Sequence, residues 1–293
     1  MNEQLAIEPI TDFTKVYQQH LNRKLAYGIV KQFFELLKFT QQHRAVSMAI
    51  LEGDDFFRNL LPNIHSRVET LLKEIELQLD NSSQLYALPP FAELKNEWAL
   101  LNSCWEKLKV IQTFEIHNHL IKKISALIWL IVEQSNYEKS NSQIDYLNHF
   151  IFREYVELLE AVAQIRGIST HLASTREKDP AMEELLNYTI NRTKGLLLKA
   201  KGGLSQVSSP EADQILTFIG QNLCFIKMEG FIHEVPSILH SNEDYISKSQ
   251  TCFKHGTQVL NAFLIVLNAS VSVLEQTLPP ELETWINNPR KLS

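Results

Sequence analysis

Glycine and proline are both scarce in this sequence, with 9 and 10 among 293 residues. Folds built from many short strands need these residues at their turns, so the composition favours long helices. Strict alternation of apolar and polar residues is also rare, and no Asn-Gly or Asp-Gly hairpin pair occurs. The sequence therefore predicts an all-α fold, and its length allows one large domain or two smaller ones.

Cysteines and long apolar runs are limited as well. The three cysteines, Cys104, Cys224 and Cys252, form no Cys-x-x-Cys pair, which is typical of a reducing compartment. The first residues, MNEQLAIEPITDF, lack the basic and apolar regions of a signal peptide. The most apolar run, residues 124–132, has nine residues, whereas a helix that crosses a bilayer needs roughly 20. We therefore expect a cytoplasmic protein with no membrane segment.

Positive charge does not dominate the chain. It has 28 Lys and Arg against 34 Asp and Glu, a formal net charge of −6. Without a basic field, nucleic acid is not expected as a direct partner. The locally basic segment 191–203 is interpreted as a solvated helix face, the alternative being a docking site for an acidic partner.

Linear motifs of enzymes and metal sites are missing from the sequence. It has no Gly-rich phosphate loop, no Gly-x-Ser-x-Gly elbow and no His-Glu-x-x-His. The ten histidines are scattered, and His117 and His119, two positions apart, diverge on a helix. We therefore expect no catalytic residues, no metal ligands and no cofactor; an enzyme without a readable motif ranks last among the functions considered.

Apolar residues recur at three- and four-residue steps between clusters of turn residues, which predicts helices. Eight helical segments result, and a polar linker near residue 140 divides them evenly. They cover about 12–52 with a break near Gly28, 55–80, a stretch after Pro89-Pro90, a stretch around 116–131, and then 143–175, 180–201, 210–233 and 244–277, the last ended by Pro279-Pro280. Two four-helix bundles in tandem are the economical arrangement.

Two of these segments carry the same motif. ELLKFTQQHRAVSMAI at 35–50 and ELLEAVAQIRGISTHL at 157–172 are identical at six of sixteen positions without a gap. The shared pairs include Arg44 with Arg166 and Ser47 with Ser169. Each half of the chain thus places one arginine at the same level of its first long helix.

Neither arginine has an acidic residue three or four positions away, so no partner on its own helix is evident. A guanidinium presents a planar fork that fits a planar oxyanion through paired hydrogen bonds, and Ser47 and Ser169 supply neutral donors beside it. Two facing arginines repel each other until an anion lies between them, which is the ingredient of a switch. The alternative is that each arginine pairs with a carboxylate from another helix or extends to the surface.

The first motif, QQHRAVSMAIL, resembles the opening motif of the nitrate- and nitrite-sensing (NIT) domain, approximately Gln-x-x-Arg-Gly-x-Ser followed by apolar residues. Residues 119–169 resemble the second block of that family, which ends in a helix carrying Glu-x-x-Gly-x-x-Arg, here Glu160-x-x-Ala163-x-x-Arg166. The similarity extends over about residues 30–275, but only the two short motifs are specific. Ala45 and Ala163 stand where the family has glycine.

The resemblance implies two packed four-helix bundles with nitrate or nitrite bound between them by Arg44 and Arg166. Family members usually join this sensor to an output module, such as an RNA-binding antiterminator, a kinase, a cyclase or a chemotaxis signalling region, and many are anchored in a membrane. No output domain is evident here, so we expect a stand-alone sensor that reports to a separate protein effector; a homodimer is left open.

The combined prediction is an all-α protein of two tandem up-down four-helix bundles packed together. The first bundle is expected over residues 1–140, the second over 141–280, and a polar tail over 281–293. Arg44 and Arg166 are expected to contact the anion, with Ser47 and Ser169 in support. The runner-up is a helical adaptor that binds another protein and no small molecule. The two readings differ in whether both arginines converge on one cavity with no carboxylate nearby.

Overall fold

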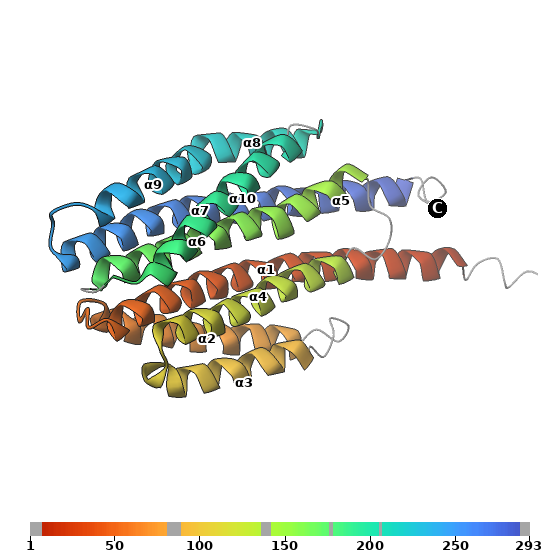
Figure 1. Cartoon of the computed structure of the whole chain (residues 1–293). Helices are drawn as coiled ribbons and strands as arrows, with labels where there is room; N and C mark the ends of the chain where they lie inside the picture. The colour runs from red at the N-terminus through yellow and green to blue at the C-terminus, as the bar shows by residue number, and fades with distance from the viewer. Residues whose placement is uncertain (1–7, 81–88, 136–141, 176–177, 205–206, 288–293) are drawn as a thin grey trace, which may run out of the picture.

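The computed structural model describes residues 8–80, 89–135, 142–175, 178–204 and 207–287. Over these ranges every regular element is helical and no strand is present, which confirms the predicted all-α class. The helices run roughly along one long axis (Figure 1). They are α1 Glu8–Leu51, α2 Leu61–Asp80, α3 Pro89–Cys104, α4 Val110–Ser135, α5 Ser142–His149, α6 Val156–Ser174, α7 Pro180–Leu204, α8 Pro210–Gln221, α9 Cys224–Leu239 and α10 Tyr245–Asn287.

The helices follow the predicted segments closely, with three differences. The break expected near Gly28 is absent, because α1 continues through it as one helix. The segment expected over 210–233 is divided into α8 and α9 at Leu223, whose φ of 52° is left-handed and cannot continue a helix. By contrast, the helix expected over 143–175 is present and is no difference, since a π-helical turn at Phe150–Tyr155 joins α5 to α6 without a break.

The third difference concerns the end of the chain. Pro279-Pro280 was expected to stop the last helix, but α10 continues through both prolines to Asn287. A proline removes a helical hydrogen bond without ending the helix where packing holds the preceding turn, and Leu278 is buried just before the pair. Of the polar tail predicted over 281–293, residues 281–287 are helical, and 288–293 lie outside the described residues.

The helices pack in two sets, one from each half of the chain, and α1 contacts both sets. In the first half of the chain, α1 packs against α2 and α4, and α3 covers α4. In the second half, α6 packs against α7 and α10, while α8 and α9 cover α10. Helix α1 also contacts both α6 and α10, so these three helices join the two halves.

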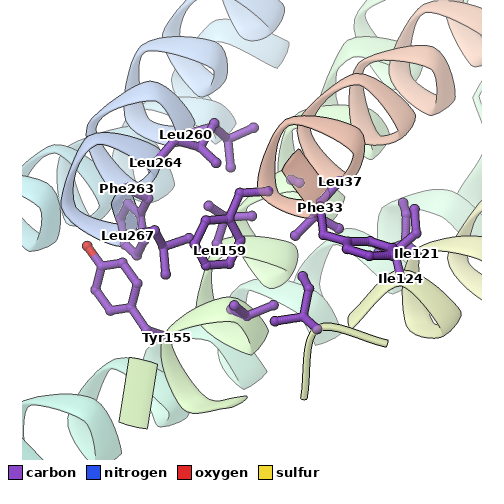
Figure 2. Packing of buried hydrophobic residues seen from close by; sticks show 14 of the residues in the cluster. Phe33, Leu37, Ile121, Ile124, Tyr155, Leu159, Leu260, Phe263, Leu264 and Leu267 are labelled. Carbon is purple, nitrogen blue, oxygen red and sulfur yellow. The ribbon is translucent and has the colours of Figure 1, made fainter. Parts of the chain in front are cut away.

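One continuous apolar core runs through both halves. Figure 2 shows Phe33 and Leu37 of α1 beside Ile121 and Ile124 of α4, with Leu159 of α6 on the way to α10. The residues of α10 labelled there are Leu260, Phe263, Leu264 and Leu267. The joint between the halves therefore belongs to the same core, and burial of its apolar side chains stabilises the arrangement of the two halves.

Helix α10 is also long and apolar enough, by length and composition alone, to cross a membrane. Its span Tyr245–Pro280 contains a window of mean hydropathy 1.7, although the sequence analysis predicted no such segment. Within the protein, 61% of that window is buried. The central helix of a folded core has the same character, so this property does not identify a membrane protein.

Candidate functional site

The side chain of Arg44 is completely buried and has a carboxylate partner. Its Nη1 lies 2.6 Å from Oε1 of Glu160, and its Nη2 lies 3.5 Å from Oε2. Glu160 belongs to α6, whereas Arg44 belongs to α1, so the ion pair links the two halves. The partner of Arg44 is thus a carboxylate from another helix, as the alternative reading of the sequence anticipated.

Three further side chains complete the surroundings of Arg44. Its Nη1 also donates to Oδ1 of Asn118 on α4, and the guanidinium lies over the ring of Phe114 at 5.5 Å. Gln41, one turn before Arg44, donates from Nε2 to Oε2 of Glu160 at 2.7 Å. Both oxygens of Glu160 therefore accept hydrogen bonds from α1, which fixes the carboxylate in one orientation.

Arg166 is equally buried but differs in its partners. Its Nη1 donates to Oγ1 of Thr257 on α10 at 3.1 Å, and its guanidinium lies over the ring of Phe253 at 5.1 Å. No carboxylate pairs with Arg166 among the residues that the structure describes. The two arginines therefore differ in their partners: Arg44 has a carboxylate partner, and Arg166 has none among the described residues.

Two donors of Arg166, Nε and Nη2, are buried and have no hydrogen-bond partner. These two N–H groups lie on the same edge of the guanidinium, so together they form the fork that holds a planar oxyanion with two parallel bonds. Nε of Arg44 and Oγ1 of Thr170 are buried without partners as well. Buried donors are almost always satisfied in proteins, so such a cluster on α1 and α6 requires an explanation.

The two arginines influence each other electrostatically. The pKa of Arg166 is lowered from 12.5 to about 9, first by burial and then by the positive charge of Arg44, while Glu160 opposes the shift. These three groups carry two positive charges and one negative charge. The site therefore holds one positive charge that no neighbouring carboxylate neutralises.

Gly256 allows α10 to approach Arg166 closely, whereas Gly167 leaves room for an ordinary contact with Arg44. A Cβ on Gly256 of α10 would lie 2.6 Å from Cγ and 2.7 Å from Cβ of Arg166, which is closer than real Cβ contacts. A Cβ on Gly167 would lie 3.7 Å from Nε of Arg44. Helix α10 is therefore packed directly against Arg166, and α1 against the residue that follows it.

The structure places Ser47 with a pair of histidines. Its Oγ lies 3.2 Å from Nδ1 of His43, which in turn lies 2.8 Å from Nε2 of His117. Because the Thr113 carbonyl only accepts, His117 donates from Nδ1 at 2.6 Å and accepts at Nε2. Burial lowers the pKa of both histidines, that of His117 to about 3, so both are neutral. Ser47 therefore contacts His43, and no hydrogen bond joins it to Arg44 in the described structure.

Ser169 also has other partners. Its Oγ donates to the backbone carbonyl of Arg166 at 3.2 Å and interacts with Cys252 of α10. Thr170, on the next position, carries the unpartnered hydroxyl named above. Of the four side chains expected to bind the ligand, the structure places Arg44 and Arg166 together and gives Ser47 and Ser169 contacts of their own.

The repeated motif explains why the two arginines meet. Helices α1 and α6 run side by side in the same direction, because Gln41 contacts Glu160 and Asp54 contacts Ser174, at sequence separations of 119 and 120. The motif recurs after a nearly equal interval, from Arg44 to Arg166. The repeat therefore places both arginines at one level of the joint, as the sequence predicted.

Several residues at the joint escaped the sequence analysis. Glu160 was noticed only as the first residue of the second motif, and nothing in the sequence indicated that it binds Arg44. Asn118, Thr257 and Gly256 gave no signal, because each comes from a helix whose contact with the motif is decided by packing. Only Gln41 was visible, three positions before Arg44 in the first motif.

In comparisons with known proteins, no protein-family model, curated protein or solved structure matches the chain. Across the described residues, no group of three or more His, Cys, Asp or Glu side chains is arranged to hold a metal ion.

Proposed function

We propose that this protein is a cytoplasmic sensor, without catalytic activity, that binds nitrate or nitrite between two helical bundles and signals to a separate protein effector. The bundles correspond to residues 1–140 and 141–280, in line with the resemblance to the NIT family. The single observation that carries the proposal is the unpartnered fork of Arg166, a buried cation whose Nε and Nη2 have no acceptor.

The charge of the site supports a small monovalent anion. The two positive charges of Arg44 and Arg166 and the negative charge of Glu160 give the site a net charge of one positive unit. Burying an uncompensated charge costs several kcal/mol, and a monovalent anion in hydrogen-bond contact offsets that cost. Nitrate and nitrite are planar, so two of their oxygens match the two parallel donors of the fork.

Binding at this position requires movement of the helices. Arg166 is 1% exposed, and Gly256 brings α10 into contact with its side chain. An anion reaches the fork only if α10 or α1 moves away from α6. The joint between the two halves is therefore the element whose packing depends on the ligand, and the effector is expected to recognise that difference.

Specific observations favour the second candidate, a helical adaptor without a small ligand. The Arg44–Glu160 ion pair gives Arg44 a purely structural role. A surface hollow of about 620 Å³ also lies between α9 and α10, lined by charged residues such as Lys227 and Glu234 together with the exposed Ile265. Such a groove suits an amphipathic helix of a partner protein.

Melting temperatures in nitrate, nitrite, chloride and sulfate at matched ionic strength distinguish the two candidates. A ligand that binds only the folded state stabilises it by about 2.7 kcal/mol at a hundredfold excess over Kd. We expect nitrate or nitrite to raise the melting temperature of the parent protein. The rise should vanish in Arg166→Lys, which keeps the charge but removes the planar fork.

Arg192→Gln is the matched control, because Arg192 pairs with Glu157 on the surface and is remote from the fork. It should respond to nitrate as the parent does. If the parent shows no anion-specific rise at millimolar concentrations, the sensor proposal is wrong and the adaptor becomes the better reading.

A further inference from the structure

We propose that Glu160 determines which anions the site accepts, by reducing two adjacent arginine charges to a single net positive charge. This inference rests on the proposed function, since it concerns the selectivity of the same site. Glu160 would not be a ligand-contacting residue of the fork. It would act through the charge that it holds beside Arg44.

The geometry supports this role because Glu160 is tied to one arginine only. Its carboxylate lies 2.6 Å from Nη1 of Arg44 and accepts a second bond from Gln41. Arg166 feels the same carboxylate through space, but its Nε and Nη2 remain without partners. The ion pair thus neutralises the charge of Arg44 and leaves Nε and Nη2 of Arg166 without an acceptor in the protein. An anion can therefore be bound by these two donors.

The net charge of the site decides the charge of the best ligand. In a buried environment the electrostatic interaction is stronger than in water, so an anion is favoured when its charge balances that of the site. With Glu160 ionised, a monovalent anion gives neutrality, whereas sulfate leaves an excess negative charge. Without the carboxylate, the two arginines match a divalent anion such as sulfate.

The surroundings of Glu160 keep its carboxylate beside Arg44. Its side chain is 14% exposed, which is low for a carboxylate, and both oxygens are oriented by donors from α1. The neighbouring Glu157, one turn earlier on the same helix, is far more exposed and binds Arg192 on the surface instead. Of these two carboxylates on α6, Glu160 therefore contributes its charge beside the buried arginines.

The test compares nitrate and sulfate binding to the parent, Glu160→Gln and Glu160→Asp by calorimetric titration at constant ionic strength. We expect the parent to bind nitrate at least tenfold more tightly than sulfate. In Glu160→Gln the preference should invert to at least tenfold in favour of sulfate, because Gln keeps the shape but removes the charge. Glu160→Asp should retain the preference for nitrate.

Loss of the carboxylate can destabilise the fold, so refolding gives a second readout. If Glu160→Gln is unfolded in dilute buffer, sulfate should restore its folded state at a tenfold lower concentration than nitrate does. Glu157→Gln is the matched control, because it loses a surface carboxylate from the same helix. Its response to the two salts measures their general effect on stability, which is subtracted.

The outcomes separate the two levels of the proposal. If the parent binds nitrate but Glu160→Gln keeps the same preference, the role of Glu160 is refuted and the anion site stands. If the parent binds neither anion, the proposed function fails and the selectivity argument fails with it.

Discussion

The contact between Gly256 and Arg166 gives the sharpest test of the joint. Gly256→Ala places a methyl group 2.6 Å from Cγ and 2.7 Å from Cβ of Arg166, and 2.9 Å from the ring of Phe231. Cβ of Arg166 is fixed to the backbone of α6, so relief requires α10 and α6 to separate. This pair of helices forms the most extensive contact within the described structure.

The magnitude follows from two opposing effects. Overpacking a closely packed core costs about 1–3 kcal/mol. Alanine is also a better helix former than glycine by about 1 kcal/mol, which reduces the loss. We therefore expect Gly256→Ala to lower the free energy of unfolding by up to about 2 kcal/mol, despite the gain in helix propensity.

Gly195→Ala is the control with the opposite sign. Gly195 lies on the exposed face in the middle of α7, and a Cβ there meets nothing within 4 Å. It should stabilise the protein by up to about 1 kcal/mol through helix propensity alone. The two proteins therefore carry the same chemical change with opposite expected effects.

Urea unfolding followed by circular dichroism measures both variants. For proteins of this size class, 1 kcal/mol corresponds to roughly 2–4 °C in melting temperature, so a thermal scan provides an independent check. If Gly256→Ala proves as stable as Gly195→Ala, α10 does not approach Arg166 as described, and the argument that binding must part these helices loses its basis.

Three further predictions concern the ion pair, the buried histidines and the turn at Leu223. Arg44→Met and Glu160→Leu should each cost about 3–5 kcal/mol in urea unfolding, because each leaves the other member of the ion pair without its partner. The double variant should recover most of the loss because it removes both members of the pair, and additive losses would contradict this. Burial lowers the pKa of His117 from 6.5 to about 3. Below pH 6.5 the unfolded chain therefore binds more protons at this histidine than the folded protein does. The contribution of His117 to the free energy of unfolding is complete above pH 6.5 and falls by about 1.4 kcal/mol per pH unit as the pH drops towards 3. In urea titrations at pH 7, 6 and 5, His117→Gln should reduce the dependence of the free energy of unfolding on pH. An unchanged dependence would refute the conclusion that His117 is buried in its neutral form. Leu223→Gly should raise the free energy of unfolding by about 1 kcal/mol, since Leu223 is exposed with a left-handed φ of 52°, while Leu223→Ala, which keeps the strain, should not.

The sequence by itself determined the class of the fold and most helix positions. Apolar spacing and turn residues located α2, α3, α4 and α7 because these signals act over short distances along the chain. The same local reasoning failed at Gly28, Leu223 and Pro279-Pro280, where a helix continues or breaks against residue preference. At Pro279-Pro280, packing of the preceding turn outweighs the proline.

The repeated motif was also a property of the sequence, and it correctly placed Arg44 and Arg166 at one level of the molecule. A repeat shows that two helices are alike but contains no information on what faces them. Only the tertiary structure decided that α1 and α6 run in the same direction with Glu160 opposite Arg44. A contact over 116 residues leaves no trace in the local pattern of either helix.

The difference between the two arginines was likewise decided by packing. Both have the same neighbours in type, and neither has an acidic residue one turn away. In the folded protein, α6 supplies a carboxylate to Arg44, while α10 supplies Thr257, Phe253 and the closely approaching Gly256 to Arg166. The sequence placed both cations on apolar stripes. The assembly of the helices buried them and determined that Nε and Nη2 of Arg166 have no acceptor in the protein.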